Sequence, residues 1–311
     1  MAIITSPQEI QEQSKYGTCV TIGNFDGVHV GHQTLIKTLK QRAKQKGLYS
    51  VVFTFDPHPM SVIAGQTPPF ITQTKQKLEL LQEMQPDYIL CLHFTQEIAN
   101  LSPEEFVETY LVKGLNTKDL VIGHDYTFGK GRRGNFELLQ QLGELHGFNV
   151  EQIQAIIKDA DVVSSTRIRT LVQEGRVEEA EPLLGRLYQV SGKVVKGQQR
   201  GGPLLGIPTA NLEVADELVP KSGVYAVWAE HEGQRYAAVA NVGHNPTFGQ
   251  EHLSVEVHIC DFEQDIYGQQ LRVHFVKRLR EEKKFSGIEE LLAQIRADIQ
   301  KAREVLGKGN T

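Results

Sequence analysis

The sequence has little cysteine, no long apolar run and no basic excess. Its 311 residues include three cysteines, each alone inside an apolar run, so we expect buried thiols in a reducing compartment rather than a disulfide framework. The formal net charge of −5 argues against nucleic-acid binding. No apolar run approaches the roughly 20 residues of a membrane span, and the N-terminus lacks a signal-peptide pattern. We therefore expect a cytoplasmic protein with no nucleic-acid or membrane partner.

Length and composition predict two folded domains, since 311 residues with 40% hydrophobic and 23% charged side chains are typical of globular chains of that size. In residues 1–185, apolar strand-like segments alternate with helical patterns. Strands are expected near 18–23, 49–55, 88–94, 119–123 and 149–155, and helices near 32–46, 74–84, 103–113 and 135–146. Ser102, Pro103 and Glu105 indicate a capping box at the start of the third helix. The alternation predicts an α/β domain, a parallel sheet with helices on both faces.

The pattern changes after Leu184-Gly185, where segments of period two begin. They lie at 188–196, 223–230, 235–242, 254–262 and 270–279. Glu232-Gly233 indicates a hairpin turn, and 286–306 has the 3.6-residue period of an amphipathic helix. Residues 186–311 are therefore expected to form a second domain, a small antiparallel β-barrel with a C-terminal helix.

The segment Gly23–His32 joins an apolar strand to a helix through a glycine-rich turn that carries His29 and His32. Unpaired N–H groups and the positive end of a helix dipole make such a turn an anion site. The imidazoles add donors where a pyrophosphate leaving group develops charge. A zinc site would need further ligands, and the chain has neither His-Glu-x-x-His nor a paired cysteine motif. The turn therefore predicts nucleotidyl transfer.

Three later segments fall where the sheet topology places strand-end loops. Asp56-Pro57-His58-Pro59 follows the second expected strand and is stiffened by its prolines. The loop 123–135 mixes glycine, aromatic and cationic residues, which suits it to a ring system and phosphates. Ser164–Arg169 opens a helix with hydroxyls and arginines, which are common phosphate partners and, for serine and threonine, also common N-caps.

The second domain carries its own glycine-rich tract, residues 197–211. Glycines permit the backbone to approach phosphates closely. Thr209 and Asn211 offer hard oxygen ligands that suit Mg²⁺. Glu256 lies on the polar face of an expected strand, opposite Val255 and Val257, and its carboxylate is suited to accept the proton of an attacking hydroxyl.

The block Gly23-Asn24-Phe25-Asp26-Gly27-Val28-His29-Val30-Gly31-His32, with the later loops, resembles the His-x-Gly-His nucleotidylyltransferases. Within that superfamily it is most similar to the adenylylating half of bacterial bifunctional riboflavin kinase/FAD synthetases, over 18–170. The resemblance implies a Rossmann-like nucleotidylyltransferase domain in which His29 and His32 act on ATP phosphates. It implies ATP contacts from Gly23, Asn24, Phe25, Asp26, His29, His32, Ser165, Thr166 and Arg169. It implies FMN contacts from Asp56, Pro57, His58, Pro59, Asp125 and Phe128.

Residues 186–300 resemble riboflavin kinase through the Gly206-Ile207-Pro208-Thr209-Ala210-Asn211 block, Gly223-Val224-Tyr225 and Val255-Glu256-Val257-His258. The resemblance implies that Glu256 is the base for the ribityl hydroxyl. It implies ATP contacts from Gly197, Gly201, Gly206, Pro208, Thr209 and Asn211, with Mg²⁺ held by Thr209 and Asn211. The family's Arg-Gly-Arg reads Arg200-Gly201-Gly202 here, so the second cation is missing from that loop.

Together these features predict a cytoplasmic bifunctional enzyme with ATP as co-substrate and Mg²⁺ as cofactor. The C-terminal domain would phosphorylate riboflavin to FMN, and the N-terminal domain would adenylylate FMN to FAD with release of pyrophosphate. We expect a monomer or weak oligomer. Two alternatives remain: an adenylyltransferase for another phosphorylated acceptor, which the C-terminal barrel argues against, and a non-catalytic flavin or nucleotide sensor.

Overall fold

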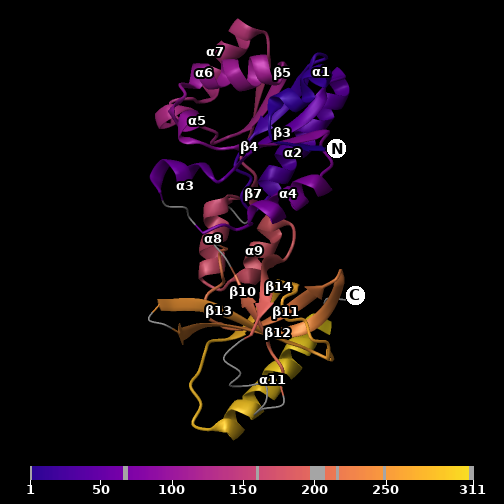
Figure 1. Cartoon of the computed structure of the whole chain (residues 1–311), viewed down its shortest axis with the longest axis vertical. Helices are drawn as coiled ribbons and strands as arrows, with labels where there is room; N and C mark the ends of the chain where they lie inside the picture. The colour runs from indigo at the N-terminus through magenta and orange to yellow at the C-terminus, as the bar shows by residue number, and fades with distance from the viewer. Residues whose placement is uncertain are drawn as a thin grey trace. The chain divides into compact units, whose positions relative to one another are not determined.

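The computed structural model describes residues 2–65, 69–158, 161–196, 207–214, 217–247 and 250–307. Its backbone contacts divide the chain into two compact units, Met1–Ser165 and Thr166–Thr311. Figure 1 shows their elements. Within the described ranges, no helix has the length and apolarity needed to cross a membrane.

The first unit is built on a six-stranded parallel sheet with the order β1-β4-β3-β2-β5-β6. Its strands are β1 (Ala2–Ile4), β2 (Thr18–Ile22), β3 (Tyr49–Asp56), β4 (Tyr88–His93), β5 (Thr117–Gly123) and β6 (Asn149–Ile153). The five predicted strands are confirmed, and β1, an edge strand of three residues, was not predicted. Strands β3, β4 and β1 lie on one side of β2, and β5 and β6 lie on the other side, so the strand order reverses between β2 and β5. Such a switch point leaves a crevice at the strand carboxyl ends, where ligands of α/β proteins bind.

Helices cover both faces of this sheet, as predicted. They are η1 (Pro7–Ile10), α1 (Gln11–Ser14), α2 (Val30–Lys46), α3 (Pro59–Ala64), α4 (Thr74–Glu83), α5 (Gln96–Asn100), α6 (Pro103–Phe106), η2 (Val107–Gly114), η3 (Lys130–Arg132) and α7 (Phe136–His146). A small hairpin, β7 (Ile157–Lys158) and β8 (Asp161–Val162), follows β6. Successive residues of a strand enter opposite apolar clusters, so that Val51 and Phe53 pack with α6 and η2 while Val52 packs with α2. The predicted capping box is confirmed, because Ser102 N–H donates to Glu105 at 2.8 Å and Glu105 N–H donates to Ser102 Oγ at 3.2 Å.

The second unit is a closed antiparallel barrel with the order β10-β13-β12-β11-β14-β9. Its elements are β9 (Tyr188–Val195), β10 (Ala210–Glu213), β11 (Gly223–His231), β12 (Gln234–Thr247), β13 (Gln250–Ile259), β14 (Gln270–Arg280) and the helix α11 (Ile288–Gly307). The predicted turn at Glu232-Gly233 is confirmed, with φ of 49° and 79° at its two residues. The fold class predicted from the sequence is therefore correct, although β10 was missed inside the glycine-rich tract.

Two helices precede the barrel strands, α8 (Ser165–Gln173) and α9 (Val177–Leu184). Helix α9 packs against β9 and β14 and buries Val177, Leu183 and Leu184 almost completely. The contact pattern thus groups 166–185 with the barrel. Independent folding of 1–185 and 186–311, as the change of sequence pattern suggests, stays a prediction.

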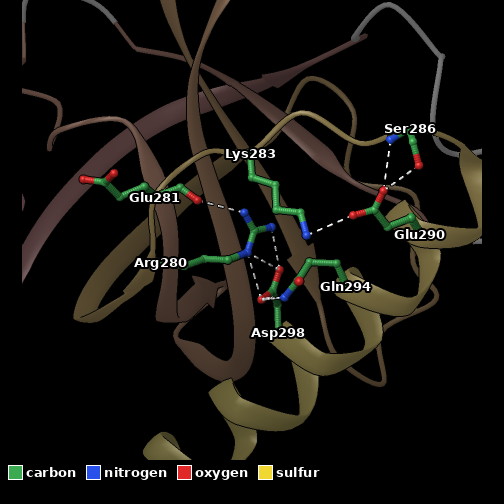
Figure 2. A network of polar contacts seen from close by, with 7 residues as sticks. All are labelled: Arg280, Glu281, Lys283, Ser286, Glu290, Gln294 and Asp298. Atoms are coloured by element: carbon green, nitrogen blue, oxygen red, sulfur yellow. Dashed lines mark hydrogen bonds and ion pairs between the residues drawn. The ribbon is translucent and has the colours of Figure 1, made fainter.

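Helix α11, yellow in Figure 1, lies against the outer surface of β11, β12 and β14 through an apolar cluster that includes Val224, Val239 and Ala302. Figure 2 shows how it is tied to the end of β14. Arg280 Nε donates to the two carboxylate oxygens of Asp298 at 3.1 and 3.0 Å, and Nη2 donates at 2.7 Å. Asp298 is only 5% exposed. A bidentate pair of this kind fixes the orientation of both partners, so it fixes α11 relative to the end of β14.

Candidate active sites

The turn after β2 has an unusual backbone that packing holds in place. Phe25 and Val28 have φ of 51° and 39°, in the left-handed region that non-glycine residues seldom adopt, and Gly27 has φ of 84°. Strain of this kind costs about 1–3 kcal/mol per residue and persists where the surroundings enforce it. Phe25 and Val28 are 1% and 2% exposed and belong to the apolar cluster under α2. The sharp turn therefore presents the N-terminus of α2 in one fixed orientation.

His29 and His32 meet at that N-terminus. His29 is the N-cap of α2, and its Nδ1 accepts the backbone N–H of His32 at 3.3 Å. The two imidazoles stack with centroids 3.6 Å apart and planes 15° apart, and Phe25 contacts His32 edge-on at 5.2 Å. Since Nδ1 of His29 accepts, its ring proton resides on Nε2 in the neutral form. The predicted helix N-terminus at this turn is confirmed, and contact of the two histidines with ATP phosphates stays a prediction.

His32 is held in its neutral form by its surroundings. Burial lowers the pKa of His32 well below its usual range, and the neighbouring imidazole of His29 lowers it further. Its Nδ1 is buried and has no hydrogen-bond partner within the described part of the chain. A neutral imidazole still donates one N–H, so the pair can stabilise developing negative charge without itself being charged.

Two other residues expected at the nucleotide site hold its shape. Asp26 is 5% exposed, and its carboxylate accepts the N–H groups of Ile71 and Thr72 at 3.0 and 3.1 Å. Ser165 Oγ donates to the carbonyl oxygen of Asp26 at 2.9 Å. The side chain of Asp26 is thus turned toward 71–72, an orientation that was not predicted. Asn24 is exposed on the turn.

Thr166 and Arg169 lie in the first two turns of α8, where Thr170 Oγ1 donates to the carbonyl oxygen of Thr166 at 3.2 Å. Both belong to the second compact unit. Their contact with the nucleotide therefore stays a prediction.

The loop Asp56–Pro59 follows β3 and is anchored at both ends. Asp56 Oδ1 accepts the hydroxyl proton of Thr74 at 2.6 Å, and the Asp56 carbonyl accepts the N–H of Phe94 at 3.0 Å. His58 caps α3 by accepting the N–H of Met60 at 3.2 Å, and its ring lies 5.9 Å from that of Phe70. The loop is partly exposed beyond the carboxyl end of β3, next to β2, as a flavin-binding loop at this sheet would be.

In the loop after β5, the predicted flavin residues have different environments. Phe128 is 8% exposed and belongs to the core, with its ring 5.8 Å from that of Phe106 and 5.6 Å from that of Tyr126. Backbone hydrogen bonds of 3.1 and 2.9 Å pair Phe128 with Gly134. Asp125 is exposed. Phe128 therefore anchors the loop to the core, whereas Asp125 lies on the surface of the loop.

The barrel places three polar side chains on neighbouring strands. Asn211 on β10 lies directly opposite Glu256 on β13, and Glu256 lies directly opposite Asn241 on β12. Directly opposed residues share a face of the sheet. That face is the outer one, because Val255 and Val257 are fully buried in the barrel. The predicted alternation of β13 is confirmed, and Asn241, which was not predicted as a site residue, is a polar neighbour of Glu256.

Thr209 stands immediately before β10, two residues from Asn211, and is half-buried. His258 Nδ1–H donates to the carbonyl oxygen of Pro208 at 2.9 Å and so fixes the start of the strand from the same face of β13 as Glu256. A cavity of about 210 Å³ adjoins Thr209 and is lined in part by 262–267, which were not predicted as site residues. Gly197, Gly201 and Gly206, with the Arg200-Gly201-Gly202 variation, lie outside the described residues.

The connection between β14 and α11 borders the same polar face. Gly243 lies under the carboxylate of Glu282, and a Cβ at this position would also lie 3.5 Å from Asn241 Nδ2, so the Glu282 side chain reaches the strand that carries Asn241. Lys283 and Arg280 lie 5.2 and 5.8 Å from the ring of Phe285. Within the described ranges, no group of three His, Cys, Asp or Glu side chains is arranged to hold a metal ion.

Comparison with known families assigns each half of the chain. A model of the FAD synthetase family matches residues 11–167, and a model of the riboflavin kinase family matches residues 184–306. The first match contains the histidine turn with the loops after β3 and β5. The second contains the Asn211–Glu256–Asn241 face.

Whole-chain relatives carry both halves in the same order. The bifunctional riboflavin kinase/FMN adenylyltransferase of Escherichia coli is 36% identical over 309 residues, which cover 99% of this chain and 98% of that protein. That of Bacillus subtilis is 38% identical over 306 residues, or 96% of each chain. A solved structure from Streptococcus pneumoniae, described as a macrolide-efflux protein, superposes with a TM-score of 0.85 at 34% identity and covers 97% of this chain and 98% of its own. The chain therefore belongs to the bifunctional riboflavin kinase/FMN adenylyltransferases, which convert riboflavin to FMN and FMN to FAD.

Proposed function

We propose that adenylylation of FMN takes place at the Gly23–His32 turn. The observation that carries this assignment is the stacked, neutral histidine pair at the N-terminus of a 17-residue helix. A phosphate oxygen of FMN attacks the α-phosphorus of ATP, the bond to the bridging oxygen of the β-phosphate breaks, and pyrophosphate leaves. Imidazole N–H groups and the helix N-terminus stabilise the charge on the leaving group. The Asp56–Pro59 loop and Asp125 are the protein's contacts for FMN.

The kinase reaction takes place on the outer barrel face centred on Glu256. Glu256 accepts the proton of the terminal ribityl hydroxyl of riboflavin while that oxygen attacks the γ-phosphorus of ATP. Asn211 and Asn241, directly opposite Glu256 on either side, orient its carboxylate and the substrate. The cavity beside Thr209 has a mixed apolar and polar lining and receives the nucleotide base of ATP.

The donor set near Thr209 fits Mg²⁺. A hydroxyl and an amide oxygen, two residues apart along the start of β10, are hard oxygen ligands that suit an ion held mainly by ATP phosphates. Thr209 and Asn211 would hold the ion, which when bound neutralises phosphate charge. Strand β13, which pairs with β10, contributes the proton acceptor Glu256 and the hydrogen bond from His258 to Pro208.

The protein is further proposed to act in the cytoplasm, as a monomer or weak oligomer, on free riboflavin, FMN and ATP. Its three cysteines are buried and unbridged, as expected for a reducing compartment. Light scattering on the purified chain tests the oligomeric state.

The adenylyltransferase is assigned to 1–185 and the kinase to 186–311.

Mixing two variants tests the assignment of the sites. Glu256→Gln protein should convert FMN but not riboflavin to FAD, whereas His32→Ala protein should stop at FMN. Because FMN diffuses from one molecule to another, an equimolar mixture with riboflavin and Mg·ATP should again yield FAD, and EDTA should abolish both steps. Chromatographic separation of the flavins gives the result. A mixture that produces no FAD would contradict two separate sites.

A further inference from the structure

The segment Ile71–Lys77, which leads into α4, contacts both loops of the adenylyltransferase site. The only feature predicted for this segment was the start of a helix. Ile71, Thr72 and Lys77 are 1%, 3% and 6% exposed, so most of the segment lies beneath the surface. Its polar groups are directed toward the turn after β2 at one end and toward the loop after β3 at the other.

Thr72 and the backbone around it hold the nucleotide turn. The N–H groups of Ile71 and Thr72 donate to the Asp26 carboxylate at 3.0 and 3.1 Å. In return, Thr72 Oγ1 accepts the N–H of Gly27 at 3.0 Å. Gly27 and Asp26 lie two and three residues before His29. The position of the histidine pair therefore depends on bonds made by a segment some 45 residues away.

Thr74 and Lys77 hold the flavin loop. The Thr74 hydroxyl donates to Asp56 Oδ1 at 2.6 Å, and Lys77 Nζ donates to the carbonyl oxygen of Phe55 at 2.9 Å. Burial lowers the pKa of Lys77, while Cys91, Asp56 and Asp26 oppose that change. A buried ammonium group is costly unless it is hydrogen-bonded and near opposite charge. Lys77 therefore binds the end of β3 at a defined place.

We propose that Ile71–Lys77 is a positioning element that sets the nucleotide turn and the flavin loop at the separation needed for adenylyl transfer. This inference rests on the proposed function of those two loops. Its residues touch no reacting atom and act through Asp26 and Gly27 on one side and through Phe55 and Asp56 on the other. Misplacement of reacting groups by about 1 Å can lower a rate by about a hundredfold. A positioning element that holds both loops therefore controls the reaction rate without contacting the substrates.

Matched substitutions at Thr72, which holds the nucleotide turn, and at Thr74, which holds the flavin loop, test the proposal in the full-length chain. Thr74→Val removes the hydroxyl that binds Asp56 and keeps the side-chain shape, and Thr74→Ser restores the hydroxyl. In the same way, Thr72→Val removes the hydroxyl that accepts the N–H of Gly27, and Thr72→Ser restores it. Steady-state FAD synthesis from FMN and ATP gives the KM for each substrate and kcat. FMN formation by the same preparation reports whether the barrel is folded, and urea unfolding followed by far-UV circular dichroism reports whether the first unit is folded.

One hydrogen bond contributes about 1–1.5 kcal/mol, or about five- to tenfold in a binding constant. Thr74→Val should therefore raise the KM for FMN by about five- to tenfold and leave the KM for ATP within about twofold. Thr72→Val should show the reverse. Both serine variants should stay within about twofold of wild type. Kinase activity should be unchanged in all four.

Wild-type constants in both valine variants would overturn the proposal, as would serine variants as impaired as the valine ones. His32→Ala separates this outcome from failure of the proposed function. If His32→Ala loses FAD synthesis while both valine variants keep wild-type constants, the positioning role of Ile71–Lys77 is wrong and the assignment of the nucleotide site stands. If His32→Ala retains full FAD synthesis, the assignment of the nucleotide site itself is wrong.

Discussion

His29 accepts the backbone N–H of His32 through Nδ1 at 3.3 Å while the two imidazoles stack 3.6 Å apart. One residue thus caps the helix and positions the ring of the other. The capping bond also sets the tautomer that neutral His29 adopts, and burial lowers the pKa of His32 well below its usual range. The pair is a preorganised set of donors at the positive end of α2.

Removal of one donor should be felt in one activity only. His32→Ala is expected to lower kcat for FAD formation from FMN by about a hundredfold or more, as loss of a charge-stabilising donor usually does. FMN formation from riboflavin should be nearly unchanged, because that site lies in the barrel. Flavin chromatography measures both products from the same preparation. An equal loss of both activities would contradict a local role.

Glu256→Gln tests the kinase base. The substitution keeps the size of a half-buried side chain between Asn211 and Asn241 but removes its ability to accept the hydroxyl proton. If Glu256 acts as the general base, riboflavin turnover should fall by roughly 10²–10⁴-fold with a modest change in KM. Synthesis of FAD from supplied FMN is the internal control. Near wild-type phosphorylation would remove Glu256 from the mechanism and leave substrate positioning to account for the rate.

Much of the fold was predictable because its signals are local. Apolar strands, the 3.6-residue period of α11 and the capping box at Ser102 each depend on neighbours along the chain. Strand β10 was missed, because the alternation of Ala210–Glu213 covers only four residues at the end of a glycine-rich tract, and the strand depends on its pairing with β9 and β13. Edge strand β1 is three residues long and depends on β4 in the same way.

The candidate sites show the same division between local and distant information. The histidine pair was predictable because its N-cap geometry is local. The orientation of Asp26 was not, because its partners are the N–H groups of Ile71 and Thr72, which tertiary folding brings to it. Nor was the burial of Phe128, which depends on packing against Phe106. A glycine-rich motif thus predicts the place of a candidate site but not which of its side chains are turned into the protein.

Two fragments test how much of the chain the barrel needs. If the domains are independent, residues 186–311 should fold and form FMN. Residues 166–311 should be more stable, because α9 buries Val177, Leu183 and Leu184 against β9 and β14, and each large apolar side chain contributes about 1.5–3 kcal/mol. Urea unfolding followed by the fluorescence of Trp228, the one tryptophan in the sequence, compares the two. Equal midpoints would show that α9 adds nothing to the barrel.

His274 on β14 is a buried titratable group away from both sites. It is 4% exposed, and its Nε2 lies 3.0 Å from Glu230 Oε2. Burial, assisted by the charges of Arg235 and Arg272, lowers the pKa of His274 to about 4, against the pull of Glu230 in the opposite direction. The unfolded chain, with an ordinary histidine pKa near 6.5, therefore binds a proton between these two values that the folded barrel does not.

It follows that the free energy of unfolding should decrease as the pH falls from about 6.5 to about 4, since stability rises with pH wherever the unfolded state binds more protons. For His274 alone the decrease between pH 7 and pH 4.5 is on the order of 2 kcal/mol. His274→Gln keeps a hydrogen-bonding group beside Glu230 but does not titrate. Urea unfolding at both pH values, followed by Trp228 fluorescence, should give a smaller difference for this variant than for wild type. The carboxylates that titrate in the same range are common to both proteins and cancel in the comparison, so an identical pH dependence would mean that His274 is protonated in the folded barrel as readily as in the unfolded chain.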